Sequence, residues 1–204
     1  MKKLLLIATL SCLSFIGHTK TAEITLSDVQ GWMSHTQQIE GSFQQQKHLS
    51  ILARPLQSQG RFYVVPSVAI LWQQLLPFQL DTLLKEESIQ QFSQGSSVSR
   101  STNTNLPSNL TSLLLAIFSG DLETLEQGFH IALESQQEHW KLSLTPKSEQ
   151  ALLSKIFREI SIEGHLSQLT SIALHEVSGD FTEIELHDIQ PVTNVPAILT
   201  DASL

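Results

Sequence analysis

Histidines are the side chains of this sequence best suited to metal or acid–base chemistry. Seven follow the first 22 residues: His35, His48, His130, His139, His165, His175 and His187. Each falls in a different predicted element, and no two have the spacing that places a pair of imidazoles on one helix face. The only cysteine, Cys12, lies near the N-terminus, far from all of them. We therefore expect structural or surface histidines, with neither a metal site nor a cofactor.

Paired carboxylates and activated nucleophiles are the other common sources of catalysis. Asp180 and Glu183 are close in sequence, but nothing in the pattern places them together in a cleft. The chain has neither a G-x-S-x-G nucleophile motif nor a glycine-rich phosphate loop. We expect no catalytic residues and a protein that is not an enzyme.

The N-terminus has the pattern of a secretory signal peptide. Two lysines precede the apolar run 4–16, and small or polar residues follow at 17–22. The run is shorter than the roughly 20 residues that span a bilayer, although an uncleaved anchor is the alternative. Cys12 follows Thr9-Leu10-Ser11, which is a poor lipidation signal. We expect residues 1–22 to be removed, with cleavage between 17 and 22, leaving one unlipidated periplasmic domain over 23–204.

The chain is acidic, with 12 lysines and arginines against 20 aspartates and glutamates, a net charge of −8. Loss of Lys2, Lys3 and Lys20 with the signal peptide would change this to −11. Such a charge disfavours nucleic acid and anionic membrane surfaces as partners. No second long apolar run follows the signal, so we expect a soluble mature protein.

Alternating apolar and polar residues between turn signals predict a sheet. The predicted strands cover residues 38–48, 50–55, 59–65, 68–75, 78–85, 88–94, 128–134, 139–144, 159–163, 168–176 and 180–189. The Ser/Thr/Asn-rich segment 95–105 is typical of a loop, and the tail 191–204 is weakly patterned. The absence of a linker or repeat indicates one domain.

Four helices accompany these strands. Ser27 and Gln30 form a candidate capping box for a helix over 28–35. Further helices are predicted over 109–118, capped by Asn109 after Pro107, over 121–127 and over 148–157. We therefore expect an α+β fold, a largely antiparallel sheet with its helices on one side.

One face of the predicted sheet is strongly apolar. Phe62, Val64, Ile70 and Trp72 share the inner face of a hairpin, and the 109–118 helix carries an apolar stripe that could cover them. Burial of apolar surface is worth roughly 25 cal/mol per Å², or about 0.8 kcal/mol per methylene, so an acyl chain would bind well in such a place. The same residues could equally pack into a dry core, which composition alone favours.

Several segments, in this order, resemble the outer-membrane lipoprotein carrier family (LolA) and its LolA-like relatives. The first is Phe43-Gln44-Gln45-Gln46-Lys47, similar to an F-x-Q-x-K strand, and the second is the hairpin 60–72. Ser119-Gly120-Asp121 with Leu125 and Phe129 is also similar, as are the strand end 140–147 and the strand 157–164. The similarity covers about residues 25–190.

The resemblance implies a curved antiparallel sheet, an incomplete β-barrel, with helices forming a lid over an apolar cavity. It implies a cavity lined by Phe43, Phe62, Val64, Ile70, Trp72, Phe78 and Leu80, and a lid stripe of Leu110, Leu113, Leu114, Ile117 and Phe118. The function implied is a monomeric periplasmic carrier or chaperone for acylated lipoprotein or lipid cargo. Its transient partners would be an inner-membrane exporter and an outer-membrane acceptor.

One difference from the family concerns the lid. The best-known members have an arginine beside the hairpin proline that holds the lid by hydrogen bonds, whereas here the segment is Val64-Val65-Pro66-Ser67. This favours the LolA-like branch associated with lipid and polyene clusters. The alternative is a periplasmic sensor of lipids or lipoproteins, which usually needs a second interaction domain that this chain lacks.

Overall fold

The computed structural model describes residues 23–34, 38–85, 88–93, 96–101, 108–150, 152–192, 194 and 196–200. The predicted signal peptide and Cys12 lie outside these ranges. The strands are β1 (Ile39–His48), β2 (Leu56–Val65), β3 (Ala69–Leu76), β4 (Leu80–Lys85), β5 (Ser88–Ser93), β6 (Ser96–Ser101), β7 (Phe129–Gln136), β8 (His139–Pro146), β9 (Phe157–His165), β10 (Gln168–Glu176) and β11 (Phe181–Pro191). The helices are α1 (Leu26–Met33), α2 (Ser108–Ser119), α3 (Leu122–Gly128), α4 (Leu153–Ile156) and α5 (Ala197–Thr200).

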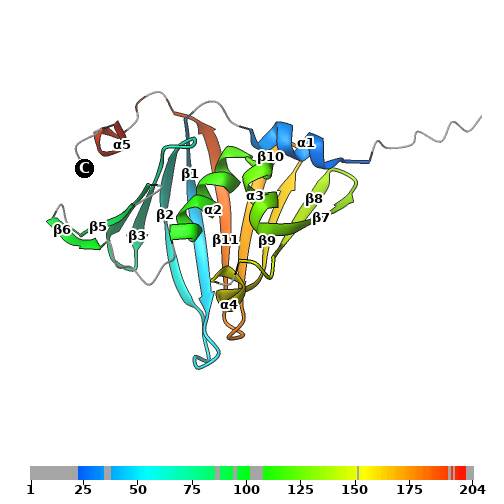
Figure 1. Ribbon diagram of the computed structural model, residues 1–204. Coiled ribbons are helices and arrows are strands. Elements are labelled where there is room, and N and C mark those ends of the chain that lie inside the picture. Colours follow the sequence, from blue (N-terminus) through cyan, green and yellow to red (C-terminus); the bar gives the residue numbers. More distant parts are fainter. Residues whose placement is uncertain are drawn as a thin grey trace, which may run out of the picture.

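The described strands form one curved antiparallel sheet in the order β6-β5-β4-β3-β2-β1-β11-β10-β9-β8-β7 (Figure 1). Pairing of β1 with β11 joins the two ends of the domain at the centre of the sheet. The sheet does not close, because β6 and β7 stand at its two ends. The predicted α+β fold with an incomplete barrel is therefore confirmed.

Strand alternation gives the sheet two chemically different faces. In β8, Trp140, Leu142 and Leu144 are buried on the concave face, while the residues between them are more exposed. Helix α2 crosses this concave face in front of the central strands (Figure 1). We call the opposite side the outer face. None of the helices within the described ranges has the length and hydrophobicity needed to span a bilayer.

The N-terminal helix begins two residues earlier than predicted. Thr25, not Ser27, is the N-cap of α1, and its hydroxyl accepts a hydrogen bond from the Asp28 N–H (3.2 Å). The Asp28 carboxylate in turn accepts from the Thr25 backbone N–H (2.8 Å), which completes a capping box. The Thr25 hydroxyl also donates to this carboxylate (2.5 Å), and the bonds that the carboxylate accepts from the Thr25 side chain and backbone lower the pKa of Asp28. A charged carboxylate is a stronger acceptor than the Gln30 amide that we expected in this role.

Two strand predictions were wrong. Residues 50–55 form the turn between β1 and β2, and Ile51 there is 87% exposed, because no strand is available to pair with this segment. The predicted loop 95–105 contains β6, whose backbone pairs with β5. An edge strand needs only backbone hydrogen bonds from its neighbour, so a serine-rich sequence can form one.

The helix predictions need smaller corrections. α2 begins before Asn109, which therefore lies inside the helix instead of capping it. α3 is capped by Asp121, whose side chain accepts from the Thr124 N–H (3.0 Å). Within the predicted helix 148–157 only the single turn α4 forms, because β9 already begins at Phe157.

Gly120 allows the tight connection between α2 and α3. Its φ of +63° lies in the left-handed region that favours glycine. A Cβ at this position would also come within 2.5 Å of the Met33 carbonyl carbon. The ends of α1 and α2 can therefore meet only because residue 120 has no side chain.

The helices do not all lie on one side of the sheet, which corrects another prediction. Leu199 of α5 packs with Ala69, Leu71 and Leu83, which alternate with the concave-face residues of β3 and β4. A second, smaller apolar cluster therefore lies on the outer face. This contact could not be predicted from the sequence, because α5 contributes only two large apolar residues, Ile198 and Leu199, within a weakly patterned tail.

Asp180 joins the β10–β11 turn to the β1–β2 turn, and it gives a pH-dependent prediction. The Ser50 backbone N–H donates to the Asp180 carboxylate (2.7 Å), and hydrogen bonds from Ser50 lower the pKa of Asp180 below its usual 3.8. A depressed pKa contributes stability above the ordinary carboxyl pKa and loses it as the pH falls through the folded-state value. We expect Asp180→Asn to destabilise the protein at pH 7 but not near pH 2.

Denaturant unfolding at the two pH values measures this effect. Glu149→Gln is the matched control, because it removes an exposed carboxylate from another connection at the same end of the sheet. A loss of stability for Asp180→Asn that is as large at pH 2 as at pH 7 would contradict the assignment.

Candidate functional site

The concave face of β1–β3 holds a continuous aromatic and aliphatic cluster. Phe43, Phe62, Val64 and Ile70 are each at most 1% exposed. Trp72 is half-buried and stacks on Phe43, with ring centroids 3.8 Å apart, and more distantly on Phe62 at 6.0 Å. Five of the seven predicted cavity residues are therefore brought together on adjacent strands.

The other two predicted cavity residues lie away from the centre of this cluster. Phe78 is 63% exposed in the turn between β3 and β4, and Leu80 is half-buried at the start of β4. Phe78 follows Pro77 in a turn, where strand alternation no longer determines which way a side chain points. The alternation argument therefore failed at this residue.

α2 covers the cluster. Phe118 packs against Phe62, with ring centroids 5.4 Å apart, and Leu113 and Ile117 are buried beside it. Leu114 is partly buried against the same core, whereas the side chain of Leu110 lies outside the described part of the structure. The predicted lid helix thus lies directly over the predicted cavity residues.

Sequence reasoning missed two further buried residues of α2, Leu115 and Ala116. They lie outside the predicted stripe, so the helix is buried on more than one side. A signal for this was present: the twelve residues of α2 include no charged side chain. A helix that is apolar on most of its surface is usually covered on most of its surface.

A directed contact joins the end of this helix to the hairpin below it. The Ser67 backbone N–H donates a hydrogen bond to the Ser119 hydroxyl (3.1 Å). Ser67 has a φ of +57°, within the tight turn that joins β2 to β3. The contact occurs beside Pro66, where the resemblance leads one to expect an arginine. A neutral hydrogen bond of this kind contributes about 0.5–1.5 kcal/mol.

Among the residues that the structure describes, α1, α2 and the sheet enclose a crevice of about 10 Å³, close to the minimum that holds one water molecule. It is lined by Trp32, Met33, Ile39, Ile117, Phe118, Ser167, Leu169 and Ile189. In this arrangement the protein's own side chains occupy the place of the predicted cavity.

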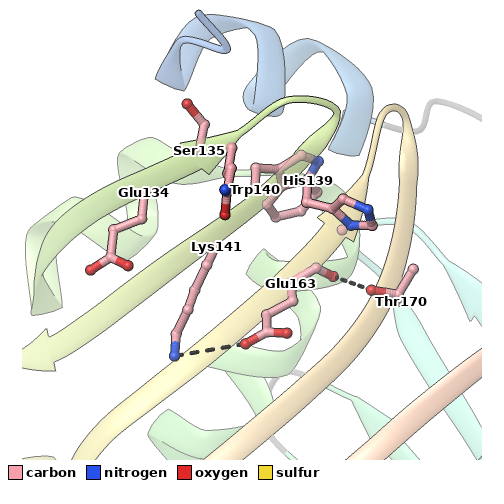
Figure 2. A pocket seen from close by; sticks show the side chains of 9 residues that line it. Glu134, Ser135, His139, Trp140, Lys141, Glu163 and Thr170 are labelled. Carbon is pink, nitrogen blue, oxygen red and sulfur yellow. Dashed lines mark hydrogen bonds and ion pairs between the residues drawn. The ribbon is translucent and has the colours of Figure 1, made fainter.

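A larger pocket of about 460 Å³ is polar and open (Figure 2). Lys141 Nζ lies 3.7 Å from Glu163 Oε1, and the Thr170 hydroxyl donates to the Glu163 backbone oxygen (3.1 Å). Figure 2 shows these groups on neighbouring strands beside the β7–β8 hairpin. Lys141 and Glu163 form an ion pair, and the residues that line the pocket show no nucleophile hydrogen-bonded to a base.

Two histidines close to this pocket face one another. The rings of His139 and His165 are 4.6 Å apart, and His165 Nε2 lies 3.1 Å from a Glu138 oxygen. The described residues include no group of three histidine, cysteine or acidic side chains that could hold a metal ion. The best-formed candidate site is therefore the apolar concave face under α2.

An open antiparallel sheet whose apolar concave face is covered by helices defines a class of small domains that can shelter hydrophobic groups. The chain belongs to the family of the outer membrane lipoprotein carrier protein LolA, whose sequence pattern it matches over residues 34–199. This is a family of periplasmic carrier proteins that is not known for enzymes. None of the curated protein sequences is significantly similar to the chain.

Two solved structures are similar to the chain at low sequence identity. A LolA superfamily protein of Nitrosomonas europaea is 11% identical, with a TM-score of 0.47, over 88% of this chain and 97% of that one. A chain of the Pseudomonas aeruginosa MucA/MucB complex is 12% identical, with a TM-score of 0.46, over 87% of this chain and 60% of that one.

Proposed function

We propose that this protein is a periplasmic carrier that binds the acyl chains of lipoproteins or lipids beneath α2 and moves them between the inner and outer membranes. The observation that carries the proposal is the uncharged α2 lying over the aromatic cluster of β1–β3, with Ser67–Ser119 as its hydrogen bond to the β2–β3 turn. The closed domain would thus be the empty carrier.

The energetics suit an exchange of contacts. Closure of α2 rests on apolar burial, which is undirected and is worth roughly 25 cal/mol per Å². An acyl chain gains about 0.8 kcal/mol per buried methylene, so a dozen methylenes could replace the contacts of Leu113, Ile117 and Phe118. The hydrogen bond from Ser67 to Ser119 is small by comparison, so it adds little to the free energy of opening once a ligand is present.

The remaining partners follow from this role. The cargo would be received from an inner-membrane exporter and delivered to an outer-membrane acceptor, with the carrier acting as a monomer. Without an arginine beside Pro66, the lid would open more easily than in standard lipoprotein carriers. This supports cargo of the lipid or polyene type handled by the LolA-like branch.

Trp72→Glu tests whether the concave face is the binding surface. Trp72 is half-buried, so a glutamate there can reach water in the closed protein but would meet the acyl chain when α2 is displaced. Burying a charged group beside a ligand costs several kcal/mol, so we expect the affinity for a fluorescent fatty acid to fall at least about 10-fold. Titration of the mature chain 23–204 measures this.

Gln59→Glu is the matched control, because it adds the same charge to an exposed position of β2. It should leave the affinity unchanged. A folded Trp72→Glu variant with normal affinity would place the ligand elsewhere.

A further inference from the structure

The exposed apolar side chains of this protein gather at one end of the sheet. Within the described residues, ten large apolar side chains are exposed, and eight belong to connections at the lower end in Figure 1 or to the strand ends beside them. Only Val68 and Leu166 lie at the opposite end. We call the eight the apolar rim: Ile51, Leu52, Leu56, Leu75, Leu76, Phe78, Leu152 and Val177.

Hydrogen bonds and strand register hold the parts of the rim side by side. The bond from Ser50 to Asp180 ties the β1–β2 turn to the β10–β11 turn. The Val177 N–H donates to the Ile156 carbonyl (2.9 Å), which ties the β10–β11 turn to α4. Leu76 pairs with Gln59 near the start of β2, so the β3–β4 turn continues the row. Four segments distant in sequence therefore form one edge.

The charge at this end is opposite to that of the rest of the chain. The rim segments 47–56, 75–80, 147–158 and 176–180 carry five basic residues and three acidic ones. After residue 22, the remainder of the sequence carries only four basic residues against 17 acidic ones. Arg54, Lys155 and Arg158 are exposed beside the rim. The overall acidity that disfavours anionic membranes therefore does not apply at this end.

We propose that the apolar rim docks onto the surface of a bilayer that contains anionic lipids. Its apolar residues stand on separate turns and strand ends, so they can enter the interfacial layer without a complementary pocket on a partner. The neighbouring cations would meet lipid headgroups, and the acidic remainder of the protein would stay in water. Only the biological role of docking rests on the proposed function: docking would hold the carrier where acyl chains are collected or delivered.

Co-sedimentation with vesicles tests the rim without any added cargo. We expect the mature chain to bind vesicles of phosphatidylglycerol and phosphatidylcholine more tightly than vesicles of phosphatidylcholine alone. Ile51→Ser with Phe78→Ser should reduce the partition coefficient at least about 10-fold. Both side chains are mostly exposed, so the double variant should fold normally.

The matched control is Val68→Ser with Leu166→Ser, which removes the two exposed apolar side chains of the opposite end. It should bind vesicles like the wild type. Equal losses in the two double variants, or no loss in the rim variant, would overturn the proposal. The proposal would also be overturned if the wild type were a dimer, the rim variant were a monomer and neither protein bound vesicles.

Trp72→Glu separates this proposal from the carrier function. A variant impaired in fatty-acid binding should still bind anionic vesicles, because its rim is unchanged. If the rim variant loses vesicle binding but retains its fatty-acid affinity, the two surfaces are independent. If vesicle binding instead follows fatty-acid affinity in every variant, the vesicles are held by the concave face and the rim proposal is wrong.

Discussion

Joining α2 covalently to the β2–β3 turn is expected to abolish acyl-chain binding. Ser67 and Ser119 already touch, since the Ser67 N–H lies 3.1 Å from the Ser119 hydroxyl. Residues 23–204 contain no cysteine, so Ser67→Cys with Ser119→Cys introduces one pair of thiols whose oxidation would join the helix to the turn. The crevice that the described residues form beneath α2 has room for about 10 Å³, so we expect a locked lid to exclude an acyl chain. Fatty-acid titration should show no binding when oxidised and normal binding after reduction.

A second disulfide controls for rigidity alone. Ser143 and Ser161 face each other on β8 and β9, so a cysteine pair there would link two strands without touching α2. That variant should bind fatty acid in both redox states. Full binding by the oxidised lid variant, with the disulfide confirmed by mass, would show that α2 need not move.

Phe118→Ala is expected to lower the free energy of unfolding by about 3 kcal/mol or more. Its ring is 3% exposed and packs on Phe62, and removal of a buried phenylalanine side chain leaves a cavity as well as losing apolar burial. Phe78→Ala is the same substitution at a position that is 63% exposed, so it should cost little. Denaturant unfolding of both variants compares them directly.

The same variants also test the predicted roles of Phe78 as a cavity residue and Phe118 as a lid residue. Phe78→Ala should leave fatty-acid affinity unchanged, because its side chain lies outside the covered face. Similar losses of stability in the two variants would contradict the packing of a buried Phe118 ring against Phe62.

Alternation of residue types was enough to predict most of the sheet, because one buried face imposes a period of two on each strand. Phe62, Val64, Ile70 and Trp72 were placed correctly for this reason. The same argument failed where a segment has no partner, as at Ile51, and in β6, whose serine-rich sequence does not alternate apolar and polar residues. It also failed at Phe78, beyond the end of β3.

The features that depend on distant contacts could not be predicted. The bond from Ser67 to Ser119 uses a backbone N–H and a common hydroxyl, which carry no sequence signature. The N-cap, by contrast, is a local feature: the Asp28 carboxylate, three residues after Thr25, is a stronger acceptor than the Gln30 amide expected to pair with Ser27. The apolar rim emerges only when the sheet register places Leu76, Ile51 and Val177 at the same end.

Hydrogen exchange of α2, with and without a bound fatty acid, tests the central claim most directly. If α2 is a lid over an acyl-binding face, residues 108–119 should exchange faster than the central strands β1 and β11 in the free protein, and ligand should change their exchange more than that of the sheet. Exchange of this helix as slow as that of β1 and β11, in both the free and the loaded protein, would show that α2 is a fixed part of the core.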